Sequence, residues 1–164
     1  MEVVGAAAAA EQAAKLLTAF RDKALPVIHI QHIAARAGAT FFLPGTVGAE
    51  IHQSVGPNQN EPVFQKHFPN SFRDTALLDY LCQEGISRLA IAGMMTHMCI
   101  DSTIRASADL GFPCSLAHDA CATRALSFNG FQVSAENVQA SYLAALNGLF
   151  AKVMSANELV STLS

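Results

Sequence analysis

A cysteine at the start of a predicted helix is the residue of this chain best suited to covalent chemistry. The stretch AGMMTHMCIDSTIRASADLGF, residues 92–112, runs from an apolar strand through glycine and two methionines to Cys99, and then becomes amphipathic. With Thr96 as the expected N-cap, Cys99 lies in the first turn, near unpaired backbone N–H groups and the positive end of the helix dipole. Both features favour the nucleophilic thiolate, and the same N–H groups can stabilise an oxyanion. We therefore predict that Cys99 is a nucleophile; the alternative is a structural cysteine buried at a strand–helix junction.

The other cysteines and the few lysines offer weaker candidates. Cysteines at 82, 99, 114 and 121 match neither a zinc pattern nor a small disulfide framework. We expect Cys82 and Cys114 to be buried thiols in a helix and a strand, and Cys121 to support a pocket rather than attack substrate. Lys66, at the C-terminal end of a short strand, is a candidate functional amine, although an ordinary rim lysine is the simpler interpretation.

Strands that alternate with helices have to position these residues. The patterns predict strands over 26–33, 61–66, 89–94, 113–120 and 151–156, and helices over 6–24, 74–85, 96–111, 134–150 and 156–163. Such alternation indicates an α/β fold with a parallel sheet and right-handed crossovers. Ligands then bind beyond the carboxyl ends of the strands, at His32, at Gly93–Cys99 and at His118–Cys121. The long irregular segment 34–60 is expected to set substrate choice.

Composition excludes several classes of partner. The chain has 164 residues, of which 51% are hydrophobic and 14% charged, with a net charge of −3. We expect one domain over residues 1–164, with enough apolar surface for a homo-oligomer. The lack of a basic cluster argues against nucleic acid and anionic membranes, and the lack of a long apolar run argues against a membrane span. The start of the chain does not resemble a signal peptide, so we expect a reduced, cytoplasmic protein.

Three motifs resemble the isochorismatase-like cysteine hydrolases over roughly residues 1–157: KHFPNSFRDTALLDYL, GISRLAIAGMMTHMCIDSTIRASADLGF and DACAT. The resemblance implies a three-layer α/β/α fold with a doubly wound, mostly parallel sheet. It implies hydrolysis of a small-molecule C–N amide bond through a thioester on Cys99, with Lys66 orienting or polarising the site. It also implies a cis peptide between Met94 and Met95, with the Met95 and Cys99 N–H groups as an oxyanion hole. Other members of the family cleave vinyl ethers, and Cys99 favours the amidase type.

One residue of the family pattern has no counterpart in this sequence. The family's third catalytic group is an aspartate at the end of a first central strand, and we expect both to be absent here. Asp119 follows a strand but matches a different family position. Loss of this proton carrier would cost about 10²–10⁴ in rate. We expect either a chain whose start has been placed too far downstream or shortened, or a naturally inactive relative that serves as an oligomeric binding or scaffold subunit.

Aromatic and histidine side chains near the strand ends are expected to contact a small-molecule substrate: His32, Phe41, Phe42, Phe72 and His97. His29 and His32 are oddly spaced on one strand and point to opposite faces, so they cannot share a metal ion. We expect no metal or other cofactor, and we expect His29 to be a hydrogen-bonded core residue. About 200° of helix rotation separates His97 from Cys99, which argues against a direct ion pair between them.

Overall fold

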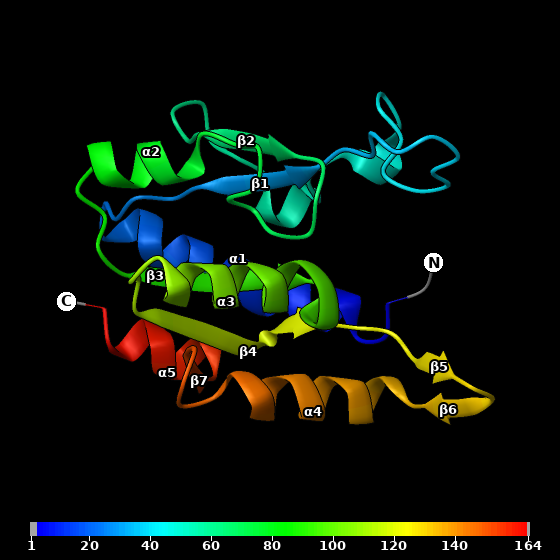
Figure 1. Cartoon of the computed structure of the whole chain (residues 1–164). Coiled ribbons are helices and arrows are strands. Elements are labelled where there is room, and N and C mark those ends of the chain that lie inside the picture. The colour runs from blue at the N-terminus through cyan, green and yellow to red at the C-terminus, as the bar shows by residue number, and fades with distance from the viewer. Residues whose placement is uncertain (1–2, 164) are drawn as a thin grey trace.

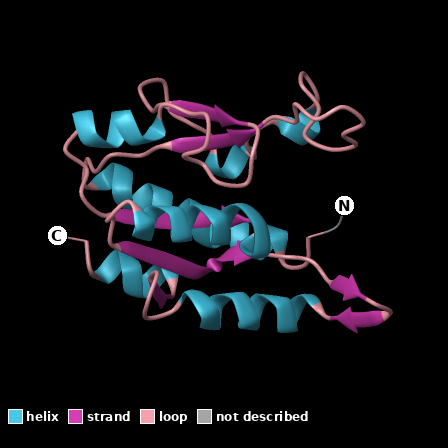
Figure 2. Cartoon of the chain, in the orientation of Figure 1, coloured by secondary structure: helices cyan, strands magenta, loops and turns pink. Residues whose placement is uncertain are grey.

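The computed structural model describes residues 3–163 as parallel strands covered by helices (Figures 1 and 2). The main elements are α1 (Ala6–Asp22), β1 (His29–His32), β2 (Val63–Lys66), α2 (Leu77–Gln83), β3 (Leu89–Met94), the π-helical turn η3 (Thr96–Ile100), α3 (Asp101–Asp109), β4 (Cys114–Ala122), β5 (Leu126–Phe128), β6 (Phe131–Val133), α4 (Ala135–Leu146), β7 (Lys152–Met154) and α5 (Ala156–Ser161). Two 3₁₀ turns, η1 (Val47–Ala49) and η2 (Gln53–Val55), lie in the long segment after β1. The order of the predicted elements is confirmed, although most of them are shorter than expected.

The parallel strands form two separate sheets. One sheet pairs β1 with β2, and the other has the order β3–β4–β7, with every pairing in both sheets parallel. This arrangement confirms the α/β fold with a mostly parallel sheet. Among residues 3–163, no ladder joins β1 to β3, and in Figure 1 the β1–β2 pair lies above the sheet that contains β4. The expectation that the chain lacks a central strand stays a prediction.

The apolar core lies on the two faces of the β3–β4–β7 sheet. Successive side chains of a strand point to opposite faces. Leu116 accordingly packs in a cluster with Ile104 and Leu146, from α3 and α4. Its neighbour Ala117 packs in a second cluster with Leu16, on the side of α1 and α5. Helices therefore cover both faces of this sheet, as a doubly wound fold requires.

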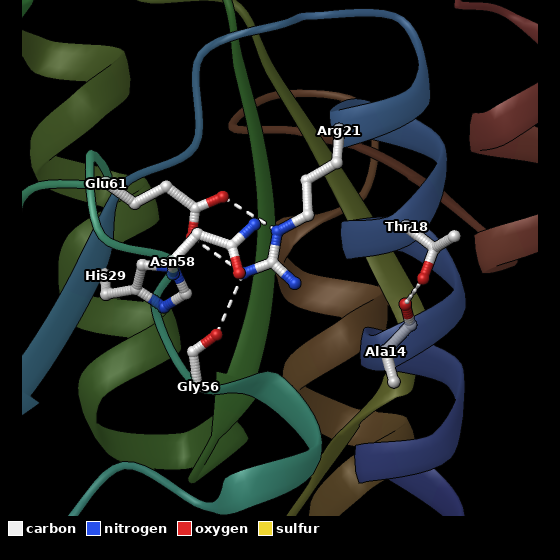
Figure 3. Close-up of polar contacts among 7 residues, drawn as sticks. All are labelled: Ala14, Thr18, Arg21, His29, Gly56, Asn58 and Glu61. Carbon is white, nitrogen blue, oxygen red and sulfur yellow. Dashed lines mark hydrogen bonds and ion pairs between the residues drawn. The ribbon is translucent and has the colours of Figure 1, made fainter.

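Polar contacts tie the β1–β2 sheet to α1. Arg21 donates from Nε and Nη2 to the two carboxylate oxygens of Glu61, at 2.7 and 2.6 Å, and from Nη2 to the Gly56 carbonyl at 2.8 Å (Figure 3). The Asn58 N–H donates to Glu61 at 2.7 Å, and His29 Nε2 lies 2.9 Å from the same carboxylate. The Arg21 hydrogen bonds lower the pKa of Glu61 to about 2. His29 is thus a buried, hydrogen-bonded residue, as predicted.

The start of the helix after β3 differs from the prediction. Thr96 is not the N-cap; the cap position is Met95, which makes no side-chain cap. Thr96 is fully buried, and its hydroxyl donates to the Ala122 carbonyl of β4 at 3.3 Å. Its side chain is therefore used to fasten the turn to the sheet instead of capping helix N–H groups.

The thiol of Cys82 is exposed, in contrast to its predicted burial. The neighbouring Leu81 is fully buried and occupies the inward side of α2. Because consecutive helical residues differ by about 100° in direction, Cys82 then faces outward. Cys114 and Cys121 are both buried, which confirms the prediction for Cys114.

The β5–β6 hairpin was not expected from the sequence. Asn129 and Gly130 both have positive φ, 48° and 81°, as a two-residue type I′ turn requires. Asn-Gly between apolar residues is the sequence signal that predicts such a hairpin. The hairpin projects away from the sheets, and Phe128 and Phe131 are each 76% exposed (Figure 1).

Candidate active site

The predicted nucleophile lies where β3 ends and the chain turns into α3. The Met94–Met95 peptide is cis, as the family resemblance implies, and Gly93 before it has a φ of 136°, a region that favours glycine. The next turn is wide because the Met95 carbonyl accepts from the N–H groups of both Met98 and Ile100, at 3.0 and 3.3 Å. Half-buried Cys99 lies within this turn.

The backbone around Met95 leaves one predicted oxyanion donor available. Among the described residues, no protein atom accepts from the Met95 N–H. Its carbonyl, by contrast, holds the two N–H groups of the wide turn. An unpaired N–H beside a nucleophilic sulfur can bind the oxygen of a carbonyl under attack.

His32 is the polar side chain that meets the sulfur. Its Nδ1 lies 3.8 Å from Cys99 Sγ, within reach of a hydrogen bond that involves sulfur. The imidazole also stacks on Phe42, with ring centroids 5.0 Å apart and 21° between the planes. Burial lowers the pKa of His32, and the charges of Lys66 and His67 lower it further. The ring is therefore uncharged at neutral pH.

Lys66 stands beside His32 because β1 and β2 run in parallel register, with His32 opposite Lys66. Only 3% of the Lys66 residue is exposed to solvent. Lys66 Nζ donates a short hydrogen bond to the Pro69 carbonyl. A buried ammonium at the carboxyl end of a strand, next to a histidine that touches the sulfur, differs from the ordinary rim lysine considered as its alternative.

The loop after Lys66 is fastened to the helix that follows Cys99. Ser71 donates from its backbone N–H to Thr103 Oγ1 at 3.1 Å, and the two hydroxyls are 2.9 Å apart. Thr103 also donates to the Pro69 carbonyl at 3.4 Å, the same carbonyl that accepts from Lys66. The position of the lysine relative to α3 thus depends on one small buried cluster of hydroxyls.

The structure does not bring all the predicted substrate residues to this site. His97 bonds Thr123 Oγ1 through Nδ1 at 2.5 Å and packs its ring against Tyr142, with centroids 6.0 Å apart. Burial lowers the pKa of His97, and the charge of Arg124 adds to this effect. The side chain of His97 thus contacts Thr123, just after β4, and Tyr142 of α4, and it makes no hydrogen bond to Cys99 among the described contacts.

Of the three predicted phenylalanines, two lie near His32 and one packs elsewhere. Phe42 stacks on His32, and Phe41, which is 48% exposed, contacts Phe42 edge-on at 5.3 Å. Phe72 stacks instead on Phe112, which follows the C-terminal end of α3, whereas Cys99 precedes its N-terminal end. Phe42 therefore borders the imidazole of His32, and Phe41 lies against Phe42.

The rival thiols do not share this setting. Burial raises the pKa of Cys121 to about 12 and also raises the pKa of Cys114, so both remain protonated.

Within residues 3–163, no group of three or more metal-ligating side chains gathers around one point. The same part of the chain holds no helix with the length and apolarity that a bilayer crossing needs.

Two surface hollows lie away from the sulfur. One, of about 440 Å³, is lined by α1 residues between Glu11 and Asp22. The other, of about 260 Å³, lies on the side of the β1–β2 sheet that carries Gln31 and Gln65. Because side chains alternate along a strand, that side is opposite His32 and Lys66.

Comparison with protein families gives one match that spans most of the chain. A model described as the isochorismatase domain matches residues 1–158. The chain is 48% identical to the isochorismatase family protein YddQ of Bacillus subtilis over 145 residues, which are 88% of this chain and 81% of YddQ. It is also 35% identical to a streptothricin hydrolase of Streptomyces noursei over 108 residues, 66% of this chain but 38% of that protein.

Solved structures show the same likeness. A crystal structure assigned as an isochorismatase hydrolase, from Oleispira antarctica, superposes with a TM-score of 0.93 at 52% identity, covering 97% of this chain and 84% of that one. An isochorismatase from Pseudomonas putida superposes with a TM-score of 0.90 at 30% identity, covering 96% of this chain and 80% of that one.

Proposed function

Because this chain belongs to the isochorismatase family of hydrolases, we propose that it is a cysteine hydrolase that cleaves a C–N amide bond of a small molecule through a thioester on Cys99. The observation that carries the proposal is the meeting of three groups from two sheets. Cys99 Sγ lies 3.8 Å from His32 Nδ1, and the buried Lys66 pairs with His32 across the β1–β2 ladder.

Each residue has a role in the proposed reaction. Cys99 attacks the carbonyl carbon, and the N–H groups of Met95 and Cys99 hold the oxygen that becomes negative. Lys66, held opposite His32 at the C-terminal end of β2, orients the site. Phe41 and Phe42 offer an apolar wall beside His32, suited to the flat or apolar part of a small substrate.

The residues with weaker support stay predictions. Phe72 and His97 were expected to contact substrate, but their rings pack against Phe112 and Tyr142. A substrate that extends along α3 or toward α4 would be needed to reach them. No metal or cofactor takes part in the reaction as we propose it.

Substitution of the nucleophile tests the proposal. Purified wild type, Cys99→Ala and Cys99→Ser are compared on a panel of small primary and secondary amides, with released ammonia or amine as the readout. We expect turnover of at least one amide by wild type alone, and an acyl mass adduct on the Cys99 peptide after a rapid quench. Cys82→Ala is the matched control, because it removes an exposed thiol elsewhere. Turnover that survives in Cys99→Ala would refute the thioester mechanism.

The alternative of a non-catalytic binding or scaffold subunit gains no support from the streptothricin hydrolase and the isochorismatase hydrolase that the chain resembles, both of which are named as enzymes. A reduced, cytoplasmic setting is part of the proposal, and it is supported by four cysteines that are all free thiols. One relative, from Verticillium dahliae, is named as a secreted effector, so location has to be measured separately.

Self-association is also part of the proposal, with a second copy of the chain seated on the β5–β6 hairpin. The hairpin residues 126–133 carry no charge, and Phe128 and Phe131 are each 76% exposed. An exposed apolar hairpin with open edges usually has a partner. Light scattering after size exclusion should show an oligomer for wild type and a monomer for the pair Phe128→Ser, Phe131→Ser. A wild-type monomer at micromolar concentration would contradict this part.

A further inference from the structure

We propose that Thr103 is a positioning residue of the candidate site, because its hydroxyl holds the loop that fixes the ammonium of Lys66. The inference rests on the proposed function and deepens it. Thr103 follows Cys99 by four residues, about one helical turn, so the two side chains leave the same side of the helix. Both face the segments of the β1–β2 sheet, since Cys99 meets His32 of β1 and Thr103 meets Ser71 in the loop after β2.

The Thr103 hydroxyl is used at every position that a hydroxyl offers. Such an oxygen carries one hydrogen to donate and two lone pairs that accept. Thr103 Oγ1 accepts from the Ser71 N–H at 3.1 Å and donates to the Pro69 carbonyl at 3.4 Å. With its one hydrogen used on that carbonyl, the oxygen accepts from the Ser71 hydroxyl, which lies 2.9 Å away. Thr103 therefore holds both ends of the three-residue segment that begins at Pro69 and ends at Ser71.

The Pro69 carbonyl carries this arrangement to the lysine. It accepts a short hydrogen bond from Lys66 Nζ in addition to the bond from Thr103. A carbonyl oxygen has two lone pairs, and these two donors account for both. Lys66 itself is placed by β2, whose register sets it opposite His32. Strand β2 thus fixes the start of the lysine side chain, and the Pro69 carbonyl, held by Thr103, fixes its end.

Burial makes this arrangement costly to lose. Lys66, Ser71 and Thr103 are all buried. A buried polar group without a partner loses its solvation and gains nothing in return. Without the Thr103 hydroxyl, the Ser71 N–H has no acceptor and the Pro69 carbonyl keeps one donor. The segment is then more stable when it opens toward water, and the Lys66 ammonium bonded to it moves as well. A misplacement of about 1 Å in a site can cost about 10²-fold in rate.

Competitive labelling with trace acetic anhydride measures the placement of Lys66 without a known substrate. The acetylation rate of the Lys66 peptide is read by mass spectrometry, with exposed Lys23 in the same molecule as the internal reference. Thr103→Val and Thr103→Ala remove the hydroxyl, whereas Thr103→Ser keeps it. Thermal unfolding confirms that each variant is folded, and either variant without the hydroxyl suffices. Ser107→Ala is the matched control, because Ser107 is a fully buried serine of α3 whose hydroxyl donates to the Thr103 carbonyl at 2.8 Å.

A positioning role predicts a selective response. Relative to Lys23, Lys66 should acetylate about tenfold faster in Thr103→Val than in wild type, because the loop that covers its amine opens more often. Thr103→Ser and Ser107→Ala should both stay close to the wild-type rate. An unchanged Lys66 rate in Thr103→Val would overturn the proposal. An equal rise in Ser107→Ala would also overturn it, because loss of any buried hydroxyl of α3 would then loosen the lysine.

Amide turnover shows whether this placement matters to the chemistry. Thr103→Val should lower kcat about tenfold and leave KM nearly unchanged, since substrate still binds but Lys66 is misplaced. Thr103→Ser should restore kcat, and Ser107→Ala should not lower it. A fall in kcat that is equal in Thr103→Val and Ser107→Ala would reject a specific role of Thr103.

The two measurements separate the two levels of inference. A selective rise in Lys66 labelling, in a protein that turns over no amide, keeps the role of Thr103 in placing the lysine and rejects the proposed function. Turnover that needs Cys99 but keeps the wild-type kcat in Thr103→Val keeps the function and rejects the role of Thr103.

Discussion

The two sheets of this protein are held in place by different forces. The β3–β4–β7 sheet is packed on both faces by apolar clusters, with Leu116 fully buried at its centre. The β1–β2 sheet depends more on polar contacts, chiefly the carboxylate of Glu61, which joins Arg21 to His29 (Figure 3). The candidate site takes its sulfur from η3, the turn that follows β3 of the first sheet, and its histidine and lysine from the second sheet.

The support of Cys99 therefore differs from the support of its predicted partners, His32 and Lys66. Apolar burial involves no charge that titrates, whereas an ion pair with a half-exposed arginine is weakened by screening salt and depends on pH. We therefore expect perturbations of the second sheet to change the alignment of the site at a smaller cost in overall stability than perturbations of the first. The predictions below are ordered from the largest expected effect to the smallest.

Truncation in the first core should be the most damaging change. Leu116→Ala removes a side chain with no exposed surface, and we expect it to lower the free energy of unfolding by about 2–5 kcal/mol. Val63→Ala on β2, where the side chain is 42% exposed, should change it by only about 0.5 kcal/mol. Urea unfolding of both variants gives the comparison, and equal losses would show that the two sheets are held alike.

Removal of the Glu61 charge should loosen the second sheet. Glu61→Gln leaves the half-buried Arg21 without its anion, and we expect a loss of about 1–3 kcal/mol in urea unfolding. The exposed Glu11→Gln on α1 is the matched control and should be neutral. If Glu61→Gln matches its control, the ionic contacts in Figure 3 contribute little to stability.

Acid should remove the same contribution. The folded-state pKa of Glu61 is lowered to about 2 from an ordinary 4.5. The carboxylate therefore stabilises the fold fully above pH 4.5, and this stabilisation is lost as pH falls toward 2. The difference in unfolding free energy between wild type and Glu61→Gln should accordingly shrink over that range. A difference that stays constant from pH 6 to pH 3 would contradict the shifted pKa.

The smallest effect concerns the contact between the two regions. Ser71→Ala removes a buried hydroxyl from Thr103 and should cost about 1 kcal/mol in urea unfolding. Because the Thr103 hydroxyl also bonds the Pro69 carbonyl used by Lys66, we expect slower alkylation of Cys99 in this variant. Ser102→Ala, one residue before Thr103 on the same helix, serves as the control. Unchanged alkylation would indicate that Lys66 is positioned without this contact.

The sequence predicted best those elements whose signal is local. The continuous apolar run at 89–94 became β3 with the expected bounds. The β5–β6 hairpin has an equally local signal in Asn129–Gly130, which was overlooked. The cis peptide at Met94–Met95 came from family resemblance, since nothing in residue spacing predicts it.

Features that depend on how distant segments meet were beyond sequence reasoning. The odd spacing of His29 and His32 correctly placed them on opposite faces, and His32 was expected near substrate. That its ring would meet a sulfur 67 positions later depends on how the β1–β2 sheet sits beside β3. Thr96 is buried because its hydroxyl donates to the Ala122 carbonyl of β4, a strand distant in sequence. Cys82 is exposed because only Leu77 and Leu81 of α2 are buried.

Among residues 3–163 no ladder joins the two sheets, and this implies two levels of amide hydrogen exchange. Backbone amides of β3 and β4 should exchange only through global unfolding, whereas those of β1 and β2 are open to exchange through release of their own unit. Cys99 follows β3, whereas His32 belongs to β1. Release of the β1–β2 sheet would therefore separate the sulfur from the imidazole while most of the molecule stays folded. Heat or mild denaturant should then inactivate this protein before its helical circular dichroism declines.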